Sequence, residues 1–97
     1  MNNTDDIRNQ IAELVTQYAK IQYSEKMFIA GETPIPPAGK VIGTSELQNM
    51  VDASLDGWLT TGRFNDKFEK GLAEFLGVKH LITVNSGSSA NLVAFNA

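Results

Sequence analysis

The chain of 97 residues contains no cysteine, a single histidine and no apolar run of about 18 residues. The missing cysteines exclude disulfides and cysteine-held metal or iron–sulfur centres within these residues. His80 has no second histidine or paired carboxylate at ligand spacing, so the pattern predicts no metal site. Residues 1–6 also lack the basic and apolar regions of a signal peptide. We therefore expect a cytoplasmic protein without a membrane span.

Basic residues are also few. The chain has 8 lysines and arginines against 11 acidic residues, and its formal net charge is -3 at pH 7. No cluster of basic residues offsets this charge, so we expect neither nucleic acid nor a membrane as a partner. The hydrophobic content of 42% and the charged content of 20% are ordinary for a globular protein. A folded chain is expected, not a disordered one.

The first segment has the periodicity of an amphipathic helix. Its apolar residues recur at the spacing of one helix face, and they are Ile7, Ile11, Leu14, Val15, Tyr18 and Ile21. The pattern predicts a helix over residues 5–22, with Thr4 as its N-cap.

Residues 23–43 show no periodicity and contain all three prolines of the chain. Proline fixes φ and removes a backbone donor, so this segment is predicted to be extended or turning. It is either a linker or an arm that lies on another surface. We favour the arm, because several of its side chains are costly to leave in water, namely Met27, Phe28, Ile29 and Ile35.

Regular structure is predicted to return at residue 44. Thr44 or Ser45 is positioned to cap a second helix, and Gly57 is positioned to end it in a left-handed conformation. The apolar face of that helix comprises Leu47, Met50, Val51 and Leu55. These patterns divide the chain into an N-terminal helix and arm, residues 1–43, and a second region, residues 44–97.

A third helix is predicted over residues 65–76. Asn65 is the expected N-cap, Phe64 the expected hydrophobic staple, and Gly77 the expected terminator. Its buried side is formed by Phe64, Phe68, Leu72, Phe75 and Leu76. Gly71 in the interior weakens the helix by roughly 1 kcal/mol relative to alanine.

Residues 80–84 form a short apolar run without polar alternation. Such a run is typical of a strand buried on both faces of a parallel sheet, and it predicts an α/β fold. One strand cannot form a sheet, so its pairing partners are expected elsewhere.

The predicted strand leads into a turn of small residues, 85–91, followed by a helical pattern. Backbone N–H groups at the start of a helix carry partial positive charge, and several of them together suit a phosphate. Gly87 permits close approach and dihedral angles closed to other residues, while Ser88 and Ser89 offer hydroxyl groups without bulk. A serine-rich helix cap without a ligand explains the same residues, so both interpretations stay open.

Other functional motifs do not fit this turn. A dinucleotide-binding fingerprint requires three glycines, and a P-loop requires a lysine after its glycine. Neither Ser86 nor Ser88 is the nucleophile of a G-x-S-x-G motif, because Val84 and Ser86 occupy the required first glycine positions.

Four stretches together resemble a known family, namely residues 57–64, 68–69, 76–80 and 84–92. They are similar to the N-terminal part of the sugar aminotransferase/dehydrase family of fold-type I, vitamin-B6-dependent enzymes. Residues 36–43, the first helix and residues 86–92 resemble its 3-dehydrases, which act on CDP-4-keto-6-deoxyglucose. The resemblance implies a homodimer with a mostly parallel seven-stranded sheet, and it makes residues 44–97 the start of the cofactor-binding large domain.

The resemblance also implies a cofactor site. In the family, the turn that matches Gly87, Ser88 and Ser89 binds the phosphate of pyridoxamine 5′-phosphate or pyridoxal 5′-phosphate. The Schiff-base lysine of the aminotransferases, the histidine that replaces it in the dehydrases, and the cysteines of a [2Fe-2S] cluster all lie downstream in the family. None is present here, so neither Lys79 nor His80 is assigned a catalytic role.

The loop of residues 58–63 is the other candidate site that the resemblance provides. It makes Thr60, Thr61 and Arg63 candidates for contact with the substrate. The alternative is structural, with Trp58 buried and Arg63 in an ordinary salt bridge.

Three functions follow as hypotheses. The first is part of a dehydrase that removes the C3 hydroxyl of a CDP-4-keto-6-deoxyhexose for 3,6-dideoxysugars of lipopolysaccharide O-antigen, together with a reductase partner. The second is a pyridoxal-phosphate-dependent nucleotide-sugar aminotransferase. The third is a non-catalytic fragment that takes part in protein interactions.

Overall fold

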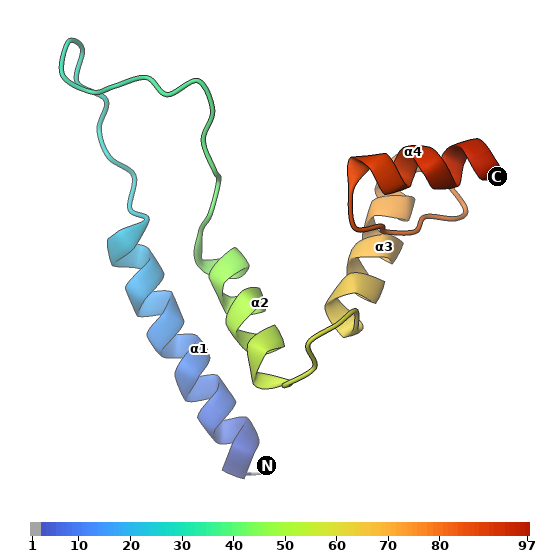
Figure 1. Ribbon diagram of the computed structural model, residues 1–97. Coiled ribbons are helices and arrows are strands. Elements are labelled where there is room, and N and C mark those ends of the chain that lie inside the picture. The colour runs from blue at the N-terminus through green and yellow to red at the C-terminus, as the bar shows by residue number, and fades with distance from the viewer. Residues whose placement is uncertain (1–2) are drawn as a thin grey trace. The chain divides into compact units, whose positions relative to one another are not determined.

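The structure is a computed structural model that describes residues 3–97. It contains four helices: α1 (Asn3–Gln22), α2 (Thr44–Leu55), α3 (Arg63–Leu76) and α4 (Gly87–Asn96) (Figure 1). The chain divides into two compact units, of which the first ends at Gly57 and the second begins at Trp58. The predicted boundary between residues 43 and 44 stays a prediction.

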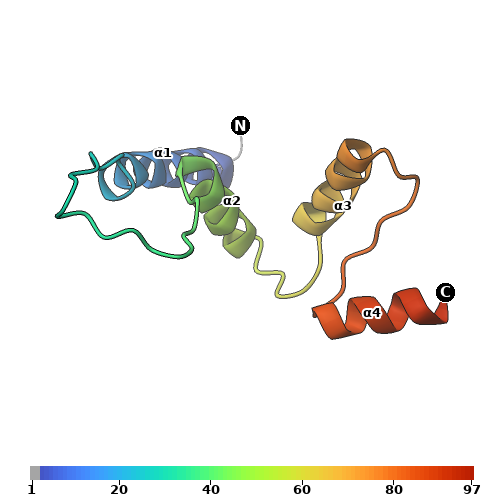
Figure 2. The same ribbon diagram turned by 90° about the horizontal axis from the view of Figure 1, so that it is seen from above.

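In the first unit, α1 and α2 lie side by side and run in opposite directions (Figures 1 and 2). The predicted span of α1 is confirmed at its C-terminal end. Its N-terminus differs, because the helix begins at Asn3 and places Thr4 inside the first turn. Asp5 and Asp6 also lie in that turn, where negative charge favours the helix dipole. Ala19 is 2% exposed, and among the described residues it is the one buried position.

Polar contacts join α1 to α2. The guanidinium of Arg8 pairs with the carboxylates of Asp52 and Asp56, the latter at 2.9 Å. One turn further along, Nε2 of Gln48 donates to Oγ1 of Thr16 at 2.7 Å. The first unit is therefore held by hydrogen bonds as well as by its apolar contacts.

The start of α2 corrects a sequence prediction. Neither Thr44 nor Ser45 caps this helix, because its N-cap is Gly43. The backbone N–H of Gly43 donates to Oε2 of Glu46 at 2.8 Å, so the glutamate satisfies the helix start from within the first turn. The predicted left-handed stop is confirmed, since Gly57 has φ 64°.

The N-terminus of α3 also begins earlier than predicted. Gly62 is the N-cap, so Asn65 lies inside the helix and Phe64 does not precede it as a staple. The C-terminal end is confirmed, because Gly77 is left-handed with φ 67°. The N–H groups of Gly77 and Val78 donate to the carbonyls of Glu74 and Ala73, which completes a Schellman motif.

The arm between α1 and α2 is irregular, as predicted, over residues 23–43. A small loop closes within it, where the N–H of Thr33 donates to the carbonyl of Ile29 at 2.9 Å. The hydroxyl of Thr33 in turn accepts from the N–H of Ile29 at 2.9 Å. Its apolar side chains are exposed, so contact of the arm with another surface stays a prediction.

The predicted strand does not form among residues 3–97, and residues 80–84 belong to the irregular connection between α3 and α4. Leu81 is half-buried, whereas Ile82 and Val84 are exposed. A β-ladder needs a second strand to accept its hydrogen bonds, and the described residues contain none. Burial on both faces is therefore wrong for this structure, which is helical throughout its regular part.

Candidate functional site

The small-residue turn begins at the N-terminus of α4. Ser86 is the N-cap in an extended conformation, with φ -162° and ψ 162°. Its hydroxyl oxygen accepts from the N–H of Ser89 at 3.0 Å, and its carbonyl accepts from the N–H of Ala90 at 3.0 Å. The helix therefore starts at Gly87, inside the motif and ahead of the predicted helical pattern. We refer to residues 85–89 as the phosphate turn, after the ligand that the sequence analysis predicts for them.

The side chain of Asn85 stabilises this turn by accepting hydrogen bonds from two of its serines. The sequence pattern assigned no role to this residue. Its Oδ1 atom accepts from the hydroxyl of Ser89 and, at 3.4 Å, from that of Ser86. The Ser89 side chain is half-buried as a result. Two of the three predicted site residues, Gly87 and Ser88, lie exposed at the first two positions of α4, whereas the Ser89 hydroxyl is committed to the turn itself.

The backbone N–H groups of Gly87 and Ser88 are free donors at the start of α4. The first amides of a helix have no intrahelical acceptor. Within the described residues, no hydrogen bond is recorded for either amide. Both lie at the positive end of the α4 dipole, so this arrangement is chemically suited to an oxyanion.

Gly87 does not use the conformational freedom expected of it. Its φ is not positive, unlike those of Gly31, Gly57 and Gly77. A Cβ atom built on Gly87 would meet no heavy atom within 4 Å. The described chain therefore neither requires a glycine here nor fills the space beside it.

The loop after Gly57 is ordered by its own tryptophan. The indole Nε1 of Trp58 donates to the carbonyl of Thr61 at 2.8 Å. A Cβ atom on Gly62 would lie 3.2 Å from Cδ1 of this indole. Trp58 is nevertheless 65% exposed, so the prediction of a buried tryptophan is wrong. The guanidinium of Arg63 lies 4.2 Å from the centre of the Phe64 ring, and a substrate contact for Thr60, Thr61 or Arg63 stays a prediction.

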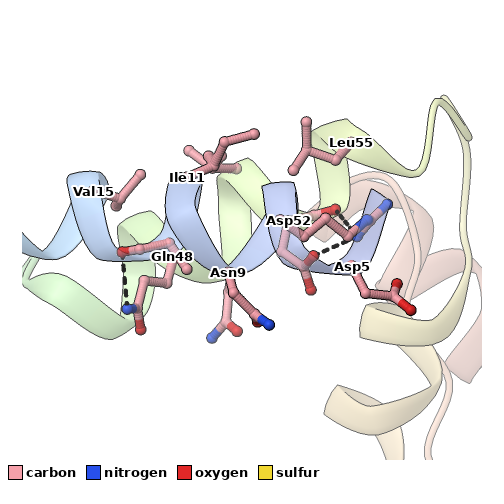
Figure 3. A pocket seen from close by; sticks show the side chains of 11 residues that line it. Asp5, Asn9, Ile11, Val15, Gln48, Asp52 and Leu55 are labelled. Atoms are coloured by element: carbon pink, nitrogen blue, oxygen red, sulfur yellow. Dashed lines mark hydrogen bonds and ion pairs between the residues drawn. The ribbon is translucent and has the colours of Figure 1, made fainter. Parts of the chain in front are cut away.

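A separate groove of about 540 Å³ runs between α1 and α2 (Figure 3). Ile11, Val15 and Leu55 line one side of it, while Asn9 and Asp5 lie on the other. Two of the charged side chains that line it, Arg8 and Asp52, form an ion pair with each other. The groove thus combines apolar surface with an ion pair that joins α1 to α2.

Two further features bear on function. Among residues 3–97, no three side chains of the kinds that hold metals are grouped closely enough to bind an ion. In the same part of the chain, no helix combines the length and apolar character needed to cross a bilayer.

Comparison with known proteins places these features in a family. The chain is 62% identical over 93 residues to the lipopolysaccharide biosynthesis protein RfbH of Salmonella typhimurium, and the alignment covers 96% of this chain and 21% of that protein. It is 37% identical over 92 residues to a dTDP-4-dehydro-2,6-dideoxy-D-glucose 3-dehydratase of Saccharopolyspora spinosa, covering 95% of this chain and 20% of the relative. The chain thus spans about a fifth of the length of these curated relatives.

A third relative carries a different activity in its name. This is a UDP-4-amino-4,6-dideoxy-N-acetyl-beta-L-altrosamine transaminase of Campylobacter jejuni, 39% identical over 56 residues, or 58% of this chain and 15% of the relative. Residues 41–97 match the DegT/DnrJ/EryC1/StrS aminotransferase family. The match includes α2, α3, the phosphate turn and α4. Because it covers more than half of the chain, the chain belongs to the DegT/DnrJ/EryC1/StrS aminotransferase family.

Proposed function

We propose that this chain is the N-terminal part of a nucleotide-sugar 3-dehydratase that removes the C3 hydroxyl of a CDP-4-keto-6-deoxyhexose. The names of two relatives support this proposal, since one is a lipopolysaccharide biosynthesis protein and the other is a 3-dehydratase of a dTDP-sugar. The CDP-linked substrate rests on the resemblance of residues 36–43 and 86–92 to the CDP-sugar dehydrases. The product belongs to the 3,6-dideoxysugars of O-antigen.

Members of the family use pyridoxal phosphate. We assign the phosphate of this cofactor, or of pyridoxamine 5′-phosphate, to Gly87, Ser88 and Ser89. The amides of Gly87 and Ser88 donate to the phosphate oxygens, and the exposed Ser88 hydroxyl provides a further donor. Ser89 contributes differently, because its hydroxyl bonds to Asn85 and its N–H to Ser86. Its role is to hold the turn in shape.

When bound, the pyridine ring of the cofactor supplies an electron sink for cleavage of the sugar C3–O bond. The residues of this chain bind the phosphate end of the cofactor and thereby orient it. The α4 dipole favours the dianionic phosphate, and the small side chains of the phosphate turn let it approach the backbone. The proposal includes a homodimer, a reductase partner and a [2Fe-2S] cluster held outside these residues.

The single observation that carries the site assignment is the pair of free amides, those of Gly87 and Ser88, at the exposed start of α4. The Cβ atom of a Gly87→Val substitution meets no heavy atom of the chain within 4 Å, and we expect the branched side chain to hinder the approach of a phosphate to the two free amides. We expect the affinity for pyridoxal 5′-phosphate, measured by titration in the full chain as its source encodes it, to fall at least tenfold, or about 1.4 kcal/mol.

Gly39→Val is the matched control. Gly39 also has an ordinary φ and open surroundings, and it lies in the arm. Its substitution is expected to leave the cofactor affinity unchanged. Equal affinities for the Gly87→Val and unsubstituted proteins would disprove the phosphate assignment.

A pyridoxal-phosphate-dependent aminotransferase is the second candidate, favoured by the family match and by the transaminase relative. The two functions differ in the residue that faces the cofactor. Sequencing the source DNA beyond the codon for Ala97 distinguishes them. A lysine at the Schiff-base position supports the aminotransferase, and a histidine together with cysteines supports the dehydratase.

A further inference from the structure

Three residues form a closed ring of hydrogen bonds between α3 and the connection that follows it. Nδ2 of Asn65 donates to Oε1 of Glu69 at 2.8 Å. The backbone N–H of Thr83 donates to Oε2 of the same carboxylate at 3.1 Å. The Thr83 hydroxyl donates to Oδ1 of Asn65 at 2.8 Å. Each residue therefore contacts the other two, and Thr83 is held by its backbone and its side chain.

The three residue types match one another as donors and acceptors. A carboxylate only accepts, and the two oxygens of Glu69 each receive one N–H group. Asn65 donates with its nitrogen and accepts with its oxygen, so the ring fixes the orientation of its amide. Asn65 and Glu69 are four residues apart on α3, which places them on one helix face. Both are half-buried.

The ring acts on the segment that leads into the phosphate turn. Thr83 lies three residues before Ser86, the N-cap of α4. The connection has no regular structure over residues 78–86, so its own backbone bonds do not hold it in one path. The ring instead ties its second half to α3, a helix closed by a Schellman motif. The positions that Ser86 can take relative to α3 are therefore restricted.

We propose that Asn65 and Glu69 are positioning residues for the cofactor phosphate, acting through Thr83. They fix the position from which the amides of Gly87 and Ser88 donate hydrogen bonds to the phosphate. The proposal rests on the function proposed above, because it requires that the phosphate turn bind a phosphate. A ring with a merely structural role would change the stability of the fold and leave the contribution of the phosphate to affinity intact.

The experiment compares two ligands that differ only in the phosphate, pyridoxal 5′-phosphate and pyridoxal. Dissociation constants for both are measured in the full chain as its source encodes it, for Thr83→Val and Glu69→Met. Thr83→Val removes the hydroxyl and keeps the backbone bond. Glu69→Met removes both acceptor oxygens, so Nδ2 of Asn65 and the N–H of Thr83 lose their acceptor.

Two variants serve as controls. Thr83→Ser keeps the hydroxyl and is expected to retain the affinity of the unsubstituted chain. Glu74→Met makes the same substitution at an exposed glutamate on the same helix, outside the ring, and is expected to have no effect. Circular dichroism of every variant reports whether the helices persist.

We expect Thr83→Val and Glu69→Met to bind pyridoxal 5′-phosphate about tenfold more weakly and pyridoxal equally well. If both ligands weaken together, or neither does, the positioning role is disproved while the phosphate assignment stands. If the unsubstituted chain binds both ligands equally, the phosphate assignment fails, and this proposal fails with it. Should Glu69→Met lose its helices, the comparison of Thr83→Val with Thr83→Ser decides the question.

Discussion

The amide of Gln48 on α2 donates to the hydroxyl of Thr16 on α1 at 2.7 Å, and both side chains are half-buried. Such a bond contributes about 1 kcal/mol when both partners are present. We expect Thr16→Val to lower the free energy of unfolding by about that amount, measured by thermal unfolding of the full chain as its source encodes it.

A double-mutant cycle with Gln48→Leu isolates the pair, and the coupling energy is expected to be about 1 kcal/mol. The Arg8–Asp52 pair is a comparison within the same groove. Its side chains are 28% and 41% exposed, so a cycle of Arg8→Met with Asp52→Asn should give less, about 0.5 kcal/mol. A larger coupling energy for Arg8 and Asp52 than for Thr16 and Gln48 would contradict this expectation.

The helix starts provide a second test. Ser86 caps α4 with its hydroxyl, whereas Ser45 sits in the first turn of α2, where the cap is Gly43. Ser86→Ala should therefore destabilise the protein by about 1 kcal/mol, and Ser45→Ala by close to zero. Hydrogen exchange of the Ser89 amide, which loses its acceptor in Ser86→Ala, is expected to accelerate. An equal effect of both substitutions would show that Ser45 caps its helix after all.

Glycines at two positions of α3 should respond in opposite directions. Gly77 has a positive φ, so Gly77→Ala is expected to cost roughly 1–2 kcal/mol. Gly71 lies in the helix interior, where an added Cβ meets no heavy atom within 4 Å. Gly71→Ala should stabilise the protein by up to about 1 kcal/mol. Thermal unfolding of the two variants checks the signs, and a stabilised Gly77→Ala protein would contradict the left-handed end of α3.

The carboxylate of Glu46 predicts a pH dependence at the start of α2. Hydrogen bonds from its own backbone N–H and from that of Gly43 lower the pKa of Glu46 below 4.5. A lowered pKa in the folded state means that the group stabilises the fold above its unfolded pKa, and that this stability is lost as the pH falls through the folded value. Exchange of the Gly43 amide should therefore accelerate, relative to neighbouring amides, only in acid.

Glu46→Gln is the control for this titration. Glutamine still offers an oxygen to Gly43 but does not ionise, so the acid-dependent change at Gly43 should disappear. A titration of Glu46 at or above its ordinary value, followed by nuclear magnetic resonance of its carboxyl carbon, would refute the assignment.

The apolar pattern was sufficient to predict the helices, but it did not locate their first residues. Periodicity defined α1 and α3 to within a few residues, and Gly57 and Gly77 marked the correct ends. The starts of α2 and α3 were missed because both N-caps are glycines, Gly43 and Gly62, without a capping side chain. In α2 the signal was present in Glu46, whose carboxylate does the capping.

The strand prediction failed for a different reason. The composition of residues 80–84 favours a β-strand, but pairing is a property of two segments, and residues 3–97 contain no partner. In the candidate site, the small residues indicated the helix start and the free amides. The bracing role of Asn85 and the ring through Thr83 depend on side-chain positions that no spacing rule specifies, although the four-residue separation of Asn65 and Glu69 placed them on one face.

At Gly87 the requirements of the fold and those of the proposed ligand can be measured separately. Its ordinary φ and empty surroundings mean that most side chains at this position are compatible with α4. A saturation library at position 87, sorted for folded protein, is expected to enrich no particular residue. If the proposed phosphate site is correct, the same library sorted for retention of the coenzyme should return to glycine, and the difference between the two selections would measure the space that the ligand requires.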